Sequence, residues 1–341
     1  MSNKNFENAL KRVNQSIPPI WFMRQAGRYH SHYQKLKEKY TFEQLCKTPD
    51  LAAEVACGPI NDFDYDIAIL FSDILFPLEL LGLKLSYKPG PTFENYLTKY
   101  HANMQLEESQ VEEKLGFQSR ALELTRMFLP ENKSLVGFVG GPWTILSYGM
   151  NIKNETTFKI NNEDTFIEKL LYDVLFPMLR KNIQMQLDAG AELVYIFDTN
   201  SIQMKGNYYL DVYMERMKYD LFFEFSSQLV YFSKNKRFYH QNIEHLNSYD
   251  LAGVVYPDGE GFNNFLKLEK PFFVQGNFSP DSLLKNHSSY LIDFEKFVQN
   301  MKHFTKKDRK GWLCSLSHGV LPKTPEANVQ HFVREIRNTF S

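Results

Sequence analysis

The sequence predicts an α/β fold, a single (β/α)8 TIM barrel with its active site at the C-terminal ends of the strands. Short β-rich runs alternate with helical stretches, and several runs are apolar throughout, as strands buried on both faces are. The eight predicted strands are residues 20–23, 67–71, 135–139, 193–197, 237–240, 253–256, 272–275 and 311–316. The pattern by itself leaves an open doubly wound sheet as an alternative.

Helices are predicted between these strands. Apolar residues recur at every fourth position from Phe166 to Met178. Residues 48–50, 279–281 and 324–326 each combine a capping hydroxyl, a proline and an acid, which is typical of a helix start. An apolar stripe near the end of the chain predicts a last helix, through Val329, Phe332, Val333, Ile336 and Phe340.

The chain is expected to form one domain over residues 1–341, with a core from about residue 17 to about residue 340. Its 341 residues are 43% hydrophobic, which is ample for a large core, and no linker or low-complexity tract interrupts them. The polar stretch 88–114 is either an excursion over the barrel mouth or a solvated loop that leads into a helix.

Composition excludes several classes of function. The net charge of −1 gives no basic field for a nucleic acid, so an anionic ligand has to meet a local cluster of Arg or Lys. The three cysteines, Cys46, Cys57 and Cys314, show neither a disulfide pattern nor zinc spacing. Apolar runs are too short to cross a membrane, and the first residues lack a signal-peptide core. We therefore expect a cytoplasmic protein.

Polar residues follow five of the predicted strands, and a barrel gathers such positions on one rim. The five segments are residues 24–28, 72–73, 140–148, 198–199 and 317–319. Arg24 and Arg28 flank Gly27, and two guanidinium groups in a close turn can each bind a carboxylate through two hydrogen bonds. The alternative is a pair of surface arginines on a loop.

Each of the other candidates also has a structural alternative. Asp73 ends an apolar run and is expected to face the cavity, or else to cap a helix or form a salt bridge. Tyr148 and His318 are either pocket residues or packed core residues. Thr199 either binds a ligand or caps a helix.

His30 and His32 resemble a metal-binding pair. They lie beyond the first predicted strand, inside the predicted helix that follows it, and no acid ends the eighth strand to complete a metal set. A solvated helix is the favoured interpretation, and no metal site is predicted.

Six segments in order along the chain resemble the uroporphyrinogen decarboxylase family. The run PIWFMRQAGRY at 19–29 is similar to the family's amino-terminal signature, and GFVGGPWTILSY at 137–148 to its second signature. The shorter matches are ILFSDIL at 69–75, FDT at 197–199, QGN at 275–277 and His-Gly at 318–319.

The resemblance implies a homodimeric barrel enzyme that needs no cofactor. It implies conversion of uroporphyrinogen III to coproporphyrinogen III in haem biosynthesis, with four acetate side chains becoming methyl groups as four molecules of carbon dioxide leave. Carried over by position, the substrate-binding residues are Arg24, Gln25, Ala26, Gly27, Arg28, Asp73, Tyr148, Thr199 and His318, and Arg24, Arg28, Asp73, Tyr148 and His318 are the catalytic candidates.

On this interpretation Asp73 accepts hydrogen bonds from the pyrrole N–H groups, and the arginines hold peripheral carboxylates. The protonated pyrrole ring serves as the electron acceptor, so neither a metal nor pyridoxal phosphate is required. The proton donor stays open. Arginine is a poor acid, with a pKa above about 12, whereas His318 has a more suitable intrinsic pKa.

Three departures from the family pattern put local loop geometry in doubt. The chain has Ser315 and Ser317 where the family usually has Asn and Gly before the histidine. It also has Gly-Met-Asn-Ile-Lys at 149–153, and it lacks Asp-Trp near 254–257. Two rival functions are a metal-dependent barrel hydrolase or zinc methyltransferase, and a porphyrinogen-binding protein without catalysis.

Overall fold

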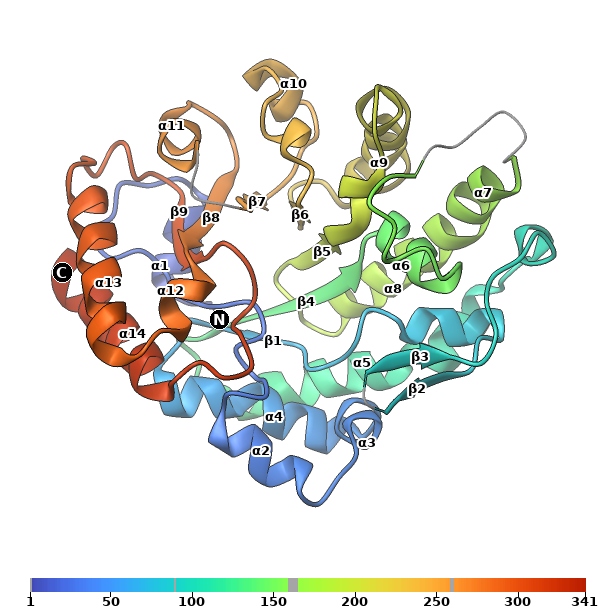
Figure 1. Ribbon diagram of the computed structural model, residues 1–341, viewed down its shortest axis with the longest axis horizontal. Coiled ribbons are helices and arrows are strands. Elements are labelled where there is room, and N and C mark those ends of the chain that lie inside the picture. Colours follow the sequence, from blue (N-terminus) through green and yellow to red (C-terminus); the bar gives the residue numbers. More distant parts are fainter. Residues whose placement is uncertain (1, 89, 159–164, 258–260) are drawn as a thin grey trace.

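The computed structural model describes residues 2–88, 90–158, 165–257 and 261–341. Within them a curled sheet of seven parallel strands runs around the molecule, with helices on its outside (Figure 1). The strands are β1 (Ile67–Ile69), β4 (Ser134–Gly140), β5 (Val194–Asp198), β6 (Leu229–Ser233), β7 (Gly253–Val255), β8 (Phe273–Phe278) and β9 (Trp312–Leu316).

The helices fill the connections between these strands. They are α1 (Lys4–Leu10), α2 (Ser31–Lys37), α3 (Phe42–Lys47), α4 (Pro49–Phe63), α5 (Glu108–Phe128), α6 (Pro142–Gly149), α7 (Thr165–Lys169), α8 (Phe176–Asp188), α9 (Glu215–Met217), α10 (Ile243–Asn247), α11 (Phe262–Lys267), α12 (Pro280–Leu284), α13 (His287–Lys302) and α14 (Glu326–Phe340). No helix in the described part of the chain is both long enough and apolar enough to cross a membrane.

Tighter and wider helical turns join these elements. The 3-10 turns are η1 (Phe76–Leu81), η2 (His101–Asn103), η4 (Thr199–Gln203), η7 (Phe223–Phe225) and η8 (Lys236–Phe238), and the π-helical turns are η3 (Leu170–Leu175), η5 (Tyr208–Met214) and η6 (Lys218–Phe222). The predicted helix through Phe166 and Met178 is confirmed as α7, η3 and α8 in succession.

The strand order decides between the two predicted sheet architectures, and two of the predicted strands need correction. Neighbouring strands follow chain order, β1-β4-β5-β6-β7-β8-β9, whereas a doubly wound sheet reverses its order at a switch point. The predicted strand at 237–240 is wrong, because η8 occupies that place and β6 lies upstream. The predicted strand at 20–23 is reduced to one parallel bridge, between Ile20 and Cys314.

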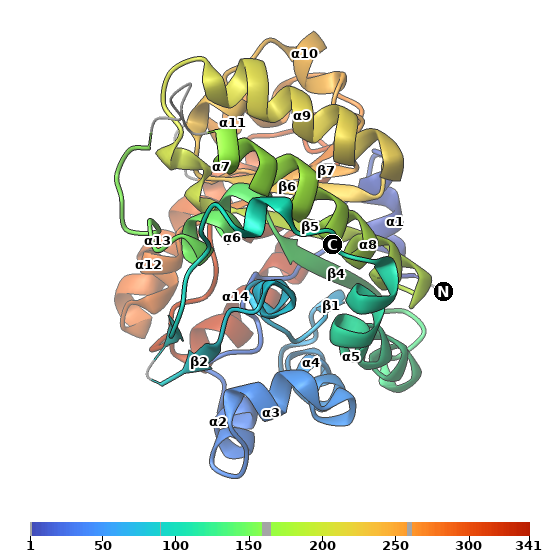
Figure 2. The ribbon, with the colours of Figure 1, turned by 90° about the vertical axis from the view of Figure 1, so that its right-hand side faces the viewer.

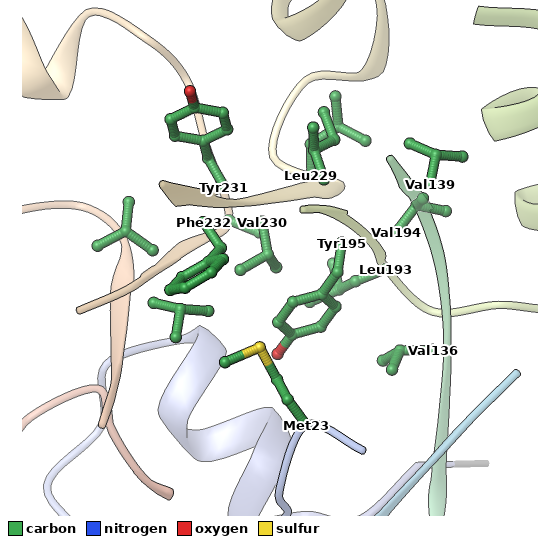
Figure 3. Close-up of a cluster of buried hydrophobic side chains, with 14 of the residues drawn as sticks. Met23, Val136, Val139, Leu193, Val194, Tyr195, Leu229, Val230, Tyr231 and Phe232 are labelled. Atoms are coloured by element: carbon green, nitrogen blue, oxygen red, sulfur yellow. The ribbon is translucent and has the colours of Figure 1, made fainter. Parts of the chain in front are cut away.

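Segment 19–23 lies between the two ends of the sheet. The Cys314 N–H donates to the Pro19 carbonyl at 2.9 Å, and the Asp66 N–H donates to the Ile20 carbonyl at 2.9 Å. On the inside of the sheet, Tyr195 and Phe232 project from β5 and β6 toward Met23 (Figure 3). Segment 19–23 therefore contributes both backbone hydrogen bonds and core side chains between β9 and β1.

The described residues of the stretch 88–114 form an excursion with its own secondary structure rather than only a solvated loop. Within it, β3 (Pro91–Phe93) pairs with the preceding β2 (Leu85–Tyr87), and this hairpin lies beside α3 (Figures 1 and 2). Farther along, the Leu97 N–H donates to the Gly149 carbonyl at 2.7 Å, at the end of α6. The excursion thus packs against the elements that follow β1 and β4.

Two of the three predicted helix starts carry the expected proline at the first helical turn. Pro49 opens α4, and Pro280 opens α12 with a cap from the Ser279 side chain. The third differs, because α14 begins at Glu326 with Pro325 in the capping position. The apolar stripe of α14 is buried as predicted, since each of its five residues packs in the core.

Candidate functional site

The candidate site residues lie where the chain leaves the carboxyl ends of the strands. Arg24 follows segment 19–23, Asp73 follows β1, Tyr148 lies on α6 after β4, Thr199 follows β5 and His318 follows β9. Parallel strands present all their carboxyl ends on the same side of a sheet. The curled sheet therefore gathers these distant segments on one rim.

Arg24 lies across the turn that carries His318. The backbone of Arg24 is left-handed, with φ of 61°, and its side chain covers Gly319. A Cβ on Gly319 would lie 2.6 Å from the Arg24 Cδ, so only glycine leaves room for the guanidinium stem. A hydrogen bond of 2.9 Å from the Val320 N–H to the Met23 carbonyl ties the two turns together.

The rest of the arginine loop has a mainly structural environment. Gln25 is buried, its Nε2 donates to the Ile67 carbonyl at 3.1 Å, and its Oε1 is buried without a partner among the described residues. Ala26 packs beside Tyr33, and Gly27 passes close to the Arg24 carbonyl. These contacts fix the backbone of the loop that follows Arg24.

Arg28 is exposed, and its charge acts on a residue other than those on which Arg24 acts. Its charge acts on Tyr33 of α2, where burial raises the pKa of the phenol to about 12 and Arg28 opposes that rise. Its backbone carbonyl accepts from Gln34 Nε2 at 2.6 Å. The structure thus places Arg28 on the loop of Arg24, while the charge of Arg24 acts on Asp73.

Asp73 is a carboxylate in a desolvated position. Burial raises its pKa, and the N–H of Leu75, the hydroxyl of Tyr87 and the charge of Arg24 oppose that rise. The Leu75 N–H donates to Asp73 Oδ1 at 2.8 Å. The Tyr87 hydroxyl lies beside the carboxylate but outside hydrogen-bonding geometry, and it is buried without a partner among the described residues.

Tyr148 is half-buried on α6 and faces the same charges. Burial and the charge of Asp73 raise its pKa, and Arg24 lowers it, so the three side chains are neighbours. The ammonium of Lys153 lies 4.8 Å from the centre of the Tyr148 ring. The loop at 149–153, which departs from the family pattern, therefore adds a positive charge beside this tyrosine.

A buried carboxylate anchors α6. Asp198 accepts hydrogen bonds from the Thr144 N–H at 3.0 Å, from Thr144 Oγ1 at 2.8 Å and from the Tyr213 hydroxyl at 2.7 Å. Gly141 permits this approach, because a Cβ there would lie 2.2 Å from the Asp198 Cβ. Thr199 is the next residue and lies half-buried at the start of η4. Asp198 thus links α6 to β5.

His318 stays neutral near neutral pH in the free protein. Burial, Lys234 and Arg24 together lower its pKa to about 4. Its ring packs edge-on against Phe232, with the ring centres 5.7 Å apart. A neutral imidazole among cations accepts a proton more readily once an anionic ligand enters.

Lys234 is a candidate site residue that the sequence prediction missed. It follows β6 directly, and burial and the charge of Arg24 lower its pKa. The predicted strand at 237–240 puts Lys234 before the strand instead of after it. The β-rich run Leu-Val-Tyr-Phe-Ser at 229–233 is the signal that locates Lys234 on the rim.

The predicted solvated helix is wrong for His30, which is buried at the start of α2, and His32 is only partly exposed. His30 Nε2 lies 2.7 Å from Asp62 Oδ2, and the imidazole of His32 packs against Gly58. The described residues contain no group of three or more His, Cys, Asp or Glu side chains that could hold a metal ion. Both imidazoles contact α4, through Asp62 and Gly58.

Comparisons with known proteins agree with these features. Residues 1–339 match the family described as Uroporphyrinogen decarboxylase (URO-D). Proteins named uroporphyrinogen decarboxylase from Orientia tsutsugamushi (strain Ikeda) and Campylobacter jejuni (strain 81116) are 33% and 31% identical, covering 98% and 94% of this chain and 98% and 95% of their own. A solved methyltransferase from Methanosarcina mazei has a TM-score of 0.75 at 14% identity, covers 99% of both chains and shows the fold alone.

Proposed function

Because the chain belongs to the uroporphyrinogen decarboxylase family, we propose that it converts uroporphyrinogen III to coproporphyrinogen III with release of four molecules of carbon dioxide. The observation that carries this proposal is the convergence of Arg24, Asp73, Tyr148 and His318 from four separate connections. One central carboxylate bordered by cations suits a macrocycle with inward N–H groups and outward carboxylates.

Substrate carboxylates are held by the positive groups of the rim. Arg24 lies close enough to Lys234 for its charge to lower the pKa of Lys234. An anion bound between the two cations relieves their repulsion. Arg28 extends the positive surface along the same loop, and Thr199 and the loop of Gln25, Ala26 and Gly27 border the same rim. His318 is expected to take up a proton when substrate binds, because a nearby carboxylate raises its pKa.

The Asp73 carboxylate binds the central N–H groups of the substrate macrocycle. Four pyrrole N–H groups directed at its carboxylate replace the solvent that burial has removed, each charge-assisted bond contributing roughly 1.5–3 kcal/mol. The fixed negative charge also stabilises the positive charge that develops on the ring during reaction. Tyr148 borders both Asp73 and Arg24 and positions the reacting acetate between them.

Each decarboxylation consumes one proton in total. A proton adds to a pyrrole carbon and makes a cationic ring, and the electron pair of the C–C bond to the carboxylate then flows into the ring as carbon dioxide leaves. The exocyclic methylene that results takes a second proton and becomes a methyl group, while the ring carbon releases the first. The substrate itself is the electron acceptor in this sequence, so the proposal calls for no cofactor.

We also propose that segment 19–23 completes a closed barrel and that the chain forms one domain. A chain of buried hydrogen bonds supports closure. The Tyr195 hydroxyl donates to Gln275 at 3.0 Å, Gln275 donates to Ser315 Oγ at 3.0 Å, and Ser315 donates to the Trp21 carbonyl at 2.7 Å. Ser315, a departure from the family pattern, has a structural partner here.

From the family resemblance we also propose that the protein is a homodimer in the cytoplasm. The dimer is tested by measuring the mass of the protein by light scattering over a range of concentrations. A mass equal to one chain, at 40.1 kDa, throughout that range would contradict the dimer.

The function is tested by anaerobic assay of the wild type and Asp73→Asn with uroporphyrinogen III, measuring carbon dioxide and coproporphyrinogen. We expect turnover in the wild type and a loss of about 100-fold to 1,000-fold in the variant, because the carboxylate charge is removed in place. Asp188→Asn, at an exposed position of α8, is the matched control.

Three outcomes would contradict the proposal. Near-normal turnover in Asp73→Asn would refute the role of Asp73. Tight binding without carbon dioxide release in the wild type would favour a binding protein. Stoichiometric zinc required for activity would favour a metal-dependent barrel enzyme.

A further inference from the structure

The hydroxyl of Tyr87 is a buried polar group that the mechanism above does not use. Tyr87 ends β2, and its ring is held by Phe42 and Phe76, with ring centres 4.7 Å and 5.9 Å away. The hydroxyl oxygen is shielded from solvent and has no hydrogen-bond partner among the described residues. A buried donor without a partner costs free energy, so a state of the protein in which it gains an acceptor is favoured.

The ring contacts hold Tyr87 beside the segment of Asp73, and the two side chains are close enough to interact. Phe76 opens η1 three positions after Asp73, so its contact with the Tyr87 ring fixes the hairpin beside the carboxylate. Asp73 and burial both raise the pKa of the phenol, which therefore stays protonated and acts as a donor. Leu75 already donates to Asp73 Oδ1, which leaves Oδ2 for a second donor.

We propose that Tyr87 is a positioning residue that donates a hydrogen bond to the Asp73 carboxylate when substrate is bound. This inference rests on the proposed decarboxylase function and adds a group from the β2–β3 hairpin to the site. A second donor favours the ionised carboxylate, which is the form that accepts hydrogen bonds from pyrrole N–H groups. The hydroxyl thereby offsets part of the desolvation of Asp73.

Other groups face this pair, and the test has to separate them. Arg24 and Tyr148 border Asp73 on the rim, and the thiol of Cys46 borders both Asp73 and Tyr87. Glu79 also acts on Tyr87 and is paired with Lys47 at 2.7 Å. All of these groups are unchanged in Tyr87→Phe, so the ratio of variant to wild-type activity isolates the hydroxyl.

The experiment measures kcat and KM of Tyr87→Phe and of the wild type across the acidic and neutral pH range. We expect the ratio of kcat values to fall as the pH is lowered, to a loss of roughly tenfold at the acidic end, with KM changed less than twofold. Because the hydroxyl has no hydrogen-bond partner among the described residues of the free protein, the midpoint of urea unfolding should be equal or higher in Tyr87→Phe.

Tyr96→Phe is the control, because it removes an exposed hydroxyl from the same part of the chain. A kcat ratio for Tyr87→Phe that is constant with pH, or a clear loss of stability in that variant, would overturn the inference. An inactive wild type would instead contradict the proposed function, so the two failures are distinct.

Discussion

Arg24 interacts with the other charged and titratable groups of the candidate site. Its stem packs over Gly319, and its charge acts on Asp73, Tyr148, Lys234 and His318. The charge of Arg24 opposes the burial that raises the pKa of Asp73, and it adds to the burial and the charge of Lys234 that lower the pKa of His318. One cation thus favours the ionised carboxylate and the neutral imidazole.

The lowered pKa of His318 predicts a pH dependence of stability. In the unfolded chain this histidine titrates near its usual 6.5, and in the folded protein near about 4. Between these values the unfolded state binds more protons, so the free energy of unfolding falls as the pH is lowered through this window. We expect His318→Gln to lose less stability than the wild type between about pH 7 and about pH 5, measured by urea unfolding.

His303→Gln serves as the control, since His303 is exposed at the end of α13. It should keep the wild-type dependence on pH. If His318→Gln lost as much stability as the wild type over the same interval, the histidine would not carry the effect.

At the scale of elements, the position of Tyr148 depends on how α6 meets β5. The first turn of α6 is held by Asp198 through Thr144, and this contact needs the bare backbone of Gly141. The loops after the strands thus bring the candidate site residues together, and the buried hydrogen bonds between Asp198 and Thr144 fix the orientation of α6.

Gly141→Ala tests this arrangement. The added Cβ would lie 2.4 Å from the Asp198 Oδ1, so α6 or the carboxylate has to move. We expect a stability loss of about 1–3 kcal/mol and a turnover loss of at least about tenfold, measured by urea unfolding and by the anaerobic assay. The matched control is Gly116→Ala in α5, where nothing lies within 4 Å of the added Cβ.

Gly116→Ala should leave turnover unchanged and raise stability by about 0.5–1 kcal/mol, because alanine favours a helix interior over glycine. Wild-type turnover in Gly141→Ala would show that α6 tolerates the shift and that Tyr148 does not depend on it.

The element predictions from sequence failed where two aromatic runs were close together. Runs 229–233 and 237–240 both contain β-prone aromatic residues, and Tyr231 and Phe238 pack together in the core with ring centres 4.9 Å apart. Only parallel pairing with β5 and β7 decides that the first run is the strand. The same error concealed Lys234.

At the scale of the whole molecule, Asp66 joins both ends of the chain to the sheet. It is 2% exposed and accepts hydrogen bonds from the Ile20 N–H at 2.7 Å, from Asn3 Nδ2 at 3.1 Å and from Arg337 at 3.1 Å. These partners come from the N-terminal segment, from segment 19–23 and from α14. A single carboxylate thus ties three distant parts of the sequence together.

We expect Asp66→Ala to lower the free energy of unfolding by about 1–3 kcal/mol, because it leaves the buried N–H of Ile20 without an acceptor, while Arg337 keeps Asp64 as a partner. Asp188→Ala, which changes an exposed acid, should stay within about 0.5 kcal/mol of the wild type. One cooperative unfolding transition in each protein is expected for a single domain. A small loss in Asp66→Ala, or two separate transitions, would contradict this account.

Local pattern was enough to predict the α/β class, six of the strands in the described residues and the terminal helix. It also predicted that the segments of Arg24, Asp73, Tyr148, Thr199 and His318 follow strands. These predictions are possible because short stretches of sequence determine burial and turn formation. Tertiary structure decided which residues lie together. The lowered pKa values of His318 and Lys234 arise from groups far apart in the chain. The burial of the Tyr87 hydroxyl without a hydrogen-bond partner among the described residues also depends on distant segments. Charge and desolvation act through space, so no pattern along the sequence contains them.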